Sequence, residues 1–212
     1  CGLSWIPSRP PGHLDQWKPQ GEDGRRGFTA IASWRGDYGP VEYRGKTYGL
    51  RGHEFRALAP LPQATGASFE IALDIHPADH ADRGLLENNG WKLIEPRSVS
   101  SDPWRYRDYV NDSLAEFMAA KNMYVETRSG WFSDRTACYL ASGKPVLVQD
   151  TGLRDLYPLG RGLLTFSSLD EAISGVSEIR TNYRSHARAA REIAAEYFDS
   201  NKVLSALVEK VA

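Results

Sequence analysis

The sequence predicts an α/β fold in which a doubly wound parallel sheet is covered by helices on both faces. Short apolar runs rich in β-branched and aromatic residues alternate with segments of helical periodicity, and no internal repeat or low-complexity tract interrupts them. Strand–helix alternation of this kind builds a parallel sheet through right-handed crossovers. The 212 residues, 41% of them hydrophobic, suffice for one well-buried domain with extensions.

Six apolar runs are expected as strands, and they occupy residues 28–34, 68–75, 91–95, 123–126, 145–149 and 163–166. Helical candidates lie between them at residues 48–58, 80–88, 106–120 and 134–142. Two further helices are expected at residues 185–197 and 200–211, and the second carries one apolar stripe. We expect this stripe to pack on the same domain or to reach a partner domain.

Residues 7–27 contain four of the twelve prolines and four glycines, a composition that suits an irregular connector. We therefore expect a connector at residues 1–24, a sheet domain at 25–184 and C-terminal helices at 185–212. Because the chain opens on Cys1 and has no initiator methionine, the connector is interpreted as the remnant of a missing N-terminal domain.

The charge balance argues against a polyanionic partner, because 26 basic and 27 acidic residues nearly cancel. Nucleic acid is therefore not expected as a partner. No apolar run approaches the roughly 20 residues of a membrane span, and no signal-like segment opens the chain. A cytoplasmic location is expected. The two cysteines, Cys1 and Cys138, match no metal spacing and are expected to be free thiols.

In an open parallel sheet the ligand binds outside the carboxyl ends of the strands, so the residues that follow each strand carry the functional prediction. Arg35 and Gly36 follow the first expected strand. Gly36 permits close backbone approach and Arg35 offers a fork of donors to an anion, although a solvated arginine in a glycine-rich turn fits equally. Polar residues also follow the second and fifth strands: His76, Asp150, Thr151 and Gly152.

The segment from 126 to 146 is the most informative. A turn at Gly130 precedes a short helix that begins at Ser133 or Asp134 and ends at Gly143. Backbone amides at a helix start are unpaired, and the helix dipole adds about 0.3 to 1 kcal/mol for a negative charge. The expected donors are the amides of Asp134, Arg135 and Thr136. The segment predicts a diphosphate site, and the alternative is a structural helix capped by Ser133 with Arg135 paired to a carboxylate.

Arg135-Thr136, followed by Leu-Ala-Ser-Gly-Lys-Pro-Val at residues 140–146, resembles the signature in the C-terminal domain of bacterial GT-B glycosyltransferases. The resemblance extends loosely over residues 28–212. It implies a Rossmann-like donor-binding domain, the C-terminal half of a GT-B fold, that binds a nucleoside-diphosphate sugar as donor and needs no further cofactor or metal. It also implies that the diphosphate lies at the helix start and that the sugar lies beside the loop after the fifth strand.

Carried over position by position, the resemblance places Ser133, Arg135 and Thr136 at the phosphates. It places Asp150, Thr151 and Gly152 near the sugar, and we expect His76, Trp91 and Glu95 near the sugar or nucleoside. One position departs from the pattern. Many retaining members have a ribose-binding glutamate five residues before the glycine, and here that residue is Cys138, a weak acceptor. The preferred base is therefore left open.

Several other residues have two interpretations. His76 and His80 with Asp79 and Asp82 have a spacing that a metal could use, but Pro77 keeps His76 off the helix, so no metal site is expected. The aromatic rings of three residues could stack on a base or pack in the core: Trp91, Trp104 and Tyr106. The roles of Arg51 and His53 are similarly open.

A GT-B enzyme takes its acceptor from the other domain, and this chain has no room for a second sheet. We therefore expect donor binding without transfer, with the leaving diphosphate stabilised by residues 133–136 and by Arg35. The alternatives are a sugar-nucleotide epimerase and a non-catalytic interaction domain that has lost its site, for which Cys138 is the supporting observation.

Overall fold

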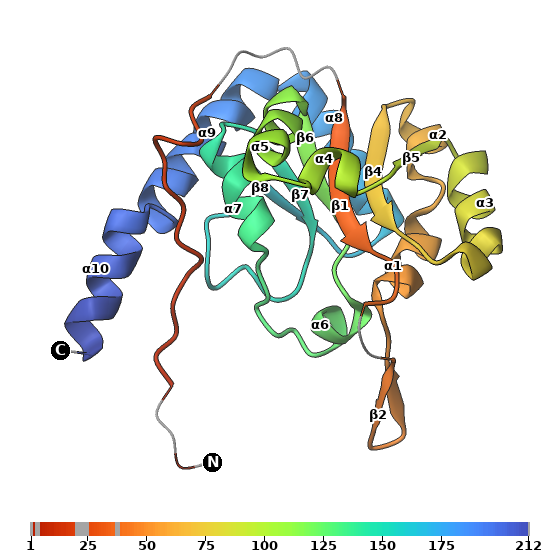
Figure 1. Cartoon of the computed structure of the whole chain (residues 1–212), viewed down its shortest axis with the longest axis horizontal. Helices are drawn as coiled ribbons and strands as arrows, with labels where there is room; N and C mark the ends of the chain where they lie inside the picture. The colour runs from red at the N-terminus through yellow and green to blue at the C-terminus, as the bar shows by residue number, and fades with distance from the viewer. Residues whose placement is uncertain (1, 3–4, 20–25, 37–38, 212) are drawn as a thin grey trace.

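The computed structural model describes residues 2, 5–19, 26–36 and 39–211 (Figure 1). At its centre lies a six-stranded sheet in the order β5-β4-β1-β6-β7-β8, with every pair of neighbours parallel. The strands are β1 (Phe28–Ser33), β4 (Phe69–Asp74), β5 (Trp91–Ile94), β6 (Ala115–Met118), β7 (Val146–Gln149) and β8 (Leu163–Phe166). The order runs outward in both directions from β1, as in a doubly wound Rossmann-like sheet, which confirms the expected fold class. The domain boundary expected near Arg25 lies outside the described residues.

Helices cover both faces of the sheet (Figure 1). One face carries α1 (Arg51–Leu58), α2 (Leu61–Thr65), α3 (His80–Asn88) and α8 (Leu169–Thr181). The other carries α4 (Arg97–Ser100), α5 (Pro103–Asp112), α7 (Asp134–Ala141) and α9 (Tyr183–Tyr197). A short 3₁₀ helix, η1 (Pro77–Asp79), directly precedes α3. Burial of an apolar stripe of each helix against the sheet drives this layering.

Trp91 belongs to the core and not to a ligand site. It is 4% exposed, and its ring centroid lies 4.9 Å from that of Phe69 and 5.6 Å from that of Phe117. Its indole Nε1 donates a 2.9 Å hydrogen bond to the carbonyl of Ala59. The expectation that Trp91 meets the nucleoside is therefore wrong, because both the ring and its one polar atom are satisfied inside the protein.

The middle of the chain differs from the expected elements. The helix expected at 106–120 ends at Asp112, and residues 115–118 form β6; residues expected as a strand at 123–126 lie in a short helix, α6 (Asn122–Glu126). All four residues of β6 are buried, so the strand shows no alternation of apolar and polar side chains. A short buried run has the same appearance in a strand and in a helix. The helix α8 was not predicted.

A hairpin of β2 (Val41–Tyr43) and β3 (Lys46–Tyr48) projects beyond the carboxyl edge of the sheet, beside α6 (Figure 1). Its two-residue turn, Arg44 and Gly45, has φ values of 51° and 73°. Two positive φ values match the right-handed twist of a tight hairpin. This hairpin was not expected from the sequence.

The last helix, α10 (Ser200–Val211), confirms the expected range and lies away from the sheet (Figure 1). Its start is tied to the N-terminal segment, because Gly12 N donates to Phe198 O at 2.6 Å and Ser200 N donates to Gly12 O at 2.9 Å. Much of its apolar surface is exposed, including Leu204 and Val208. No helix in the described part of the chain is long and apolar enough to cross a membrane.

Candidate functional site

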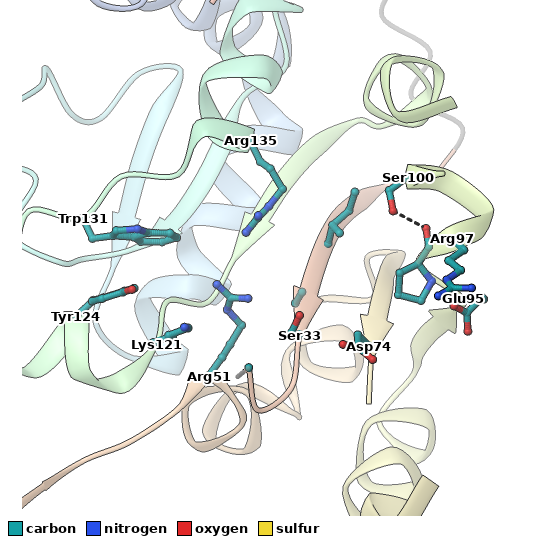
Figure 2. Close-up of a pocket in the computed structure, with 14 residues that line it drawn as sticks. Ser33, Arg51, Asp74, Glu95, Arg97, Ser100, Lys121, Tyr124, Trp131 and Arg135 are labelled. Carbon is teal, nitrogen blue, oxygen red and sulfur yellow. Dashed lines mark hydrogen bonds between the residues drawn. The ribbon is translucent and has the colours of Figure 1, made fainter. Parts of the chain in front are cut away.

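A cavity of about 610 Å³ opens at the carboxyl edge of the sheet, where β1 and β6 lie side by side (Figure 2). Strands added after β1 extend the sheet on one side, and β6 begins the extension on the other, so this is the point at which the strand order reverses. Loops that leave the two strands in opposite directions create a crevice there. Two other hollows of the surface are larger, but we call this one the main cavity because it lies where an open α/β sheet binds its ligand.

Four cationic side chains line this cavity, and three of them come together from different elements: Arg51, Lys121 and Arg135. The fourth is Arg97, the first residue of α4. Arg51 is the first residue of α1, and its Nε donates a 3.0 Å hydrogen bond to Ala119 O. Lys121 lies three residues after the end of β6, and Arg135 lies in the first turn of α7. Figure 2 shows these three side chains reaching toward the same space. Like charges gathered on one cavity stabilise an anion placed between them.

Arg135 is the member of this group with the fewest competing partners. Within the described residues, its guanidinium makes no hydrogen bond and no ion pair. Gly36 also lines the cavity and has a φ of +83°, and a Cβ added there would lie 3.5 Å from Lys121 Nζ, an ordinary contact distance. The positive φ, and not a lack of space, therefore favours glycine at this position.

The helix start of α7 differs from the expected anion cradle. The amide of Arg135 is already bound, because Ser133 Oγ accepts from it at 3.2 Å and Asp134 Oδ1 at 3.0 Å. Ser133 and Thr136 are fully buried, and Asp134 is exposed outside the cavity lining. Of the run 133–136, only the side chain of Arg135 lines the cavity. The amide of Arg135 is therefore not available to a phosphate, whereas the expected contacts of the amides of Asp134 and Thr136 stay predictions.

Glu116 is a buried carboxyl on β6 that faces α7. It is 3% exposed, and burial raises its pKa to about 7, against the opposing effects of the nearby hydroxyl of Thr136 and the charge of Arg135. A buried carboxyl of this kind exchanges its proton near neutral pH. Sequence reasoning missed it because the residue was assigned to a helix.

Arg35 does not line the main cavity. Its Nε donates a 2.9 Å hydrogen bond to Asp79 Oδ2, and its second nitrogen binds the other carboxylate oxygen. This guanidinium holds the pKa of Asp79 below its ordinary value. Asp82 is similarly bound by Arg56 at 2.7 Å. The expected phosphate contact of Arg35 is not supported, and both aspartates that a metal would use are paired with arginines.

His76 lines a neighbouring hollow of about 560 Å³ together with Arg35. Its Nδ1 accepts a hydrogen bond from the amide of Ala78 at 3.1 Å, so it caps η1. Ser33, Gly36 and Asp74 line both this hollow and the main cavity. His76 is therefore adjacent to the cavity without facing into it.

The loop after β7 supports the cavity wall and does not form it. Thr151 is fully buried, and its hydroxyl donates a 2.7 Å hydrogen bond to the carbonyl of Trp131, while Gly130 N donates to Thr151 O at 2.7 Å. Asp150 Oδ1 accepts from the amide of Gly152 at 2.9 Å. The expected sugar contact of Thr151 is thus wrong, because Thr151 is buried against the segment that carries Trp131. The expected sugar contacts of Asp150 and Gly152, which do not line this cavity, stay predictions.

The two ends of the cavity have different chemistry (Figure 2). At one end Trp131 and Tyr124 stack with ring centroids 5.0 Å apart and an angle of 21° between the planes. At the other end lie the carboxylates of Asp74 and Glu95, together with the side chain of Arg97. Glu95 therefore lies on the wall of the cavity, and its expected place near the sugar or nucleoside stays a prediction. Arg51, Lys121 and Arg135 lie between these two ends.

Comparison with known proteins gives the family. A family model described as glycosyl transferase-like matches residues 56–209, which is more than half of the chain. The chain belongs to the glycosyl transferase-like family. No curated protein matches it.

Solved structures similar to this glycosyl transferase-like chain are glycosyltransferases of low sequence identity. AviGT4, a glycosyltransferase involved in avilamycin A biosynthesis, aligns with a TM-score of 0.61 and 13% identity over 94% of this chain and 54% of its own. A glycosyltransferase from Rickettsia africae aligns with 0.63 and 11% over 94% and 54%. Sucrose-phosphate synthase from Thermosynechococcus elongatus aligns with 0.61 and 10% over 95% and 51%. These likenesses show the GT-B type of Rossmann-like fold, and the chain spans about half the length of each of these proteins.

In this glycosyl transferase-like domain the sequence reasoning missed Lys121, Tyr124 and Trp131. Lys121 follows β6, the strand that was assigned to a helix, so its position at the carboxyl end of a strand was hidden.

Cys138, where many retaining members have the ribose-binding glutamate, does not line the cavity. Its side chain lies near Tyr106, and burial raises the pKa of the thiol to about 12. The carboxylates on the cavity wall come from Asp74 and Glu95.

Proposed function

We propose that this domain binds a nucleoside-diphosphate sugar as the donor of a glycosyl transfer, with the diphosphate between Arg51, Lys121 and Arg135. The convergence of these three cations on one cavity carries the proposal. They come from α1, the loop after β6 and α7, so the fold brings together charges that would otherwise repel one another. Holding like charges together lowers stability unless an anion binds between them.

The growing charge on the leaving diphosphate gives these side chains their chemical role. As the bond to the sugar breaks, negative charge accumulates on the phosphate oxygens, and donors fixed nearby stabilise it more than they stabilise the ground state. Arg135 offers a planar fork that suits two phosphate oxygens, and Lys121 acts as a point charge. No step of this scheme needs a divalent metal.

The carboxylates at the other end suit the ribose. In Rossmann-like sheets an acidic side chain at the carboxyl end of a strand accepts hydrogen bonds from ribose hydroxyls. Asp74 ends β4, and Glu95 follows β5 directly. We assign the nucleoside to this end of the cavity.

We further propose that the acceptor approaches from a second domain. The single sheet supplies one wall of the cleft, and the similar solved proteins are about twice as long as the part that aligns. Positioning an acceptor oxygen is worth up to about 7 to 11 kcal/mol of barrier, so donor binding by the 212-residue chain is expected without detectable transfer. The epimerase alternative is weaker, since the matching family is described as transferase-like.

Calorimetry with a panel of UDP, GDP, ADP, CDP and dTDP tests the donor proposal. At least one diphosphate should bind much more tightly than its bare nucleoside, because the three cations recognise phosphate. Binding that weakens as salt is raised would agree with this recognition. Equal affinity for a nucleoside and its diphosphate, or no binding by any member of the panel, would overturn it.

A further inference from the structure

We propose that the stacked pair Tyr124 and Trp131 is the platform for the pyranosyl group of the donor, and that Thr151 positions it. This inference rests on the proposed donor function. It assigns to two aromatic side chains the recognition of the transferred sugar, as distinct from the diphosphate and the nucleoside.

The platform is rigidly held. Trp131 O accepts from the buried hydroxyl of Thr151 at 2.7 Å, and Trp131 N donates to Ser129 Oγ at 3.3 Å. The indole then stacks on Tyr124 with 5.0 Å between ring centroids. Both backbone polar atoms of Trp131 are thus bound, and its ring has a neighbour on one face. A side chain fixed in this way loses little conformational entropy when a ligand binds.

The position of the pair places it next to the transferred group. A nucleotide sugar is linear, with the nucleoside at one end, the diphosphate in the middle and the sugar at the other end. Figure 2 shows the same order of complementary side chains: Asp74 and Glu95, then the cations, then Tyr124 and Trp131. With the ribose hydroxyls at the carboxylate end, the aromatic end is left for the sugar.

The chemistry of the pair suits a pyranose. The face of an aromatic ring carries partial negative charge, and one face of a pyranose presents polarised C–H bonds. Stacking between them selects sugars with an uninterrupted face of axial C–H bonds. A nucleobase also stacks on aromatic rings, so the test separates these two ligands.

The experiment measures two dissociation constants for each variant of the 212-residue chain, one for the nucleoside diphosphate that binds and one for its hexose derivative, for example UDP and UDP-glucose or UDP-galactose. In the unmodified chain the sugar should increase affinity. Trp131→Ala should weaken binding of the sugar nucleotide by about threefold to tenfold and leave the diphosphate within about twofold. Tyr124→Leu gives the same comparison if Trp131→Ala does not fold.

Two further variants sharpen the result. Thr151→Val keeps the shape of Thr151 and removes its hydrogen bond to Trp131, and it should reproduce the selective loss in part. Trp104→Ala is the matched control, because Trp104 is 61% exposed on α5 and lies outside the cavity lining. It should leave both affinities unchanged.

The outcomes separate the two proposals. Equal weakening of both ligands would place the base on the aromatic pair and overturn the sugar platform while donor binding stands. The platform would likewise be overturned by unchanged affinities in Trp131→Ala and Tyr124→Leu, or by a sugar that adds no affinity in the unmodified chain. Failure of every diphosphate to bind would overturn the donor function itself.

Discussion

The hydroxyl of Thr151 donates a 2.7 Å hydrogen bond to the carbonyl of Trp131, which joins the loop after β7 to the wall of the cavity. Thr151 is fully buried, so no part of it meets a ligand. Thr151, in the loop after β7, can therefore affect the cavity only indirectly, through its hydrogen bond to Trp131.

Thr151→Val should lower the free energy of unfolding by about 1 to 3 kcal/mol, because it leaves the partly buried carbonyl of Trp131 without its donor. Thr127→Val is the matched control. Thr127 makes a hydrogen bond of the same length, 2.7 Å, to Met123 O but is exposed, so water replaces its hydroxyl. Urea denaturation measures both. Equal losses in the two variants would show that burial of the Thr151 bond does not matter.

Arg135→Ala should weaken nucleoside-diphosphate binding by about tenfold to a hundredfold, since a hydrogen bond to a charged group is worth about 1.5 to 3 kcal/mol. The melting temperature should hardly change, because no described residue pairs with this guanidinium. Arg188→Ala on α9, whose side chain is 77% exposed, serves as the control and should leave affinity unchanged. A large fall in melting temperature with constant affinity would show that Arg135 is structural.

The free energy of unfolding of the unmodified protein should fall as Glu116 loses its proton with rising pH, and Glu116→Gln should abolish this fall. The pKa of Glu116 is raised from 4.5 to about 7 in the folded state, so the folded protein holds this proton more tightly than the unfolded chain. The resulting stability is complete below about pH 4.5 and is lost as pH rises through about 7. The loss is on the order of 3 kcal/mol.

Denaturation curves between about pH 4.5 and 8 test this prediction, because the amide that replaces the carboxyl has no proton to lose over that range. The free energy of unfolding of Glu116→Gln, relative to that of the unmodified protein, should increase with pH. Glu192→Gln, at an exposed position of α9, should show no such increase. Parallel curves for the unmodified protein and Glu116→Gln would mean that Glu116 titrates like an exposed carboxyl.

Gly162→Ala should be strongly destabilising. A Cβ at this position would overlap the backbone nitrogen of Ala190 and lie 2.7 Å from the backbone carbonyl carbon of Ala189, so α9 would have to move away from the sheet. Gly160→Ala controls for backbone strain, because Gly160 also has a positive φ, 100°, but nothing lies within 4 Å of its added Cβ. We expect Gly162→Ala to cost about 1 to 3 kcal/mol more than Gly160→Ala in thermal or urea denaturation. Similar costs would show that strain alone acts at both positions.

Local sequence patterns were enough to predict the fold class and most elements. Five of the six expected strands and the helices α1, α3, α7, α9 and α10 were confirmed, because each has apolar periodicity or a clear end signal of its own. The alternative interpretation of Ser133, as the cap of α7, was confirmed. These features depend on neighbouring residues along the chain, which is where sequence patterns are informative.

Only the tertiary structure decided which side chains form the site. Arg35 and Thr151 carry the right chemistry, but Asp79 binds the first and the second is buried against Trp131. Lys121 and Trp131 gave no local signal and reach the cavity only because β6 pairs with β1 and because the loop after β7 fixes the segment before α7. Sequence determines which groups a residue offers, whereas contacts between residues far apart in the chain determine whether a group is already bound or faces the ligand.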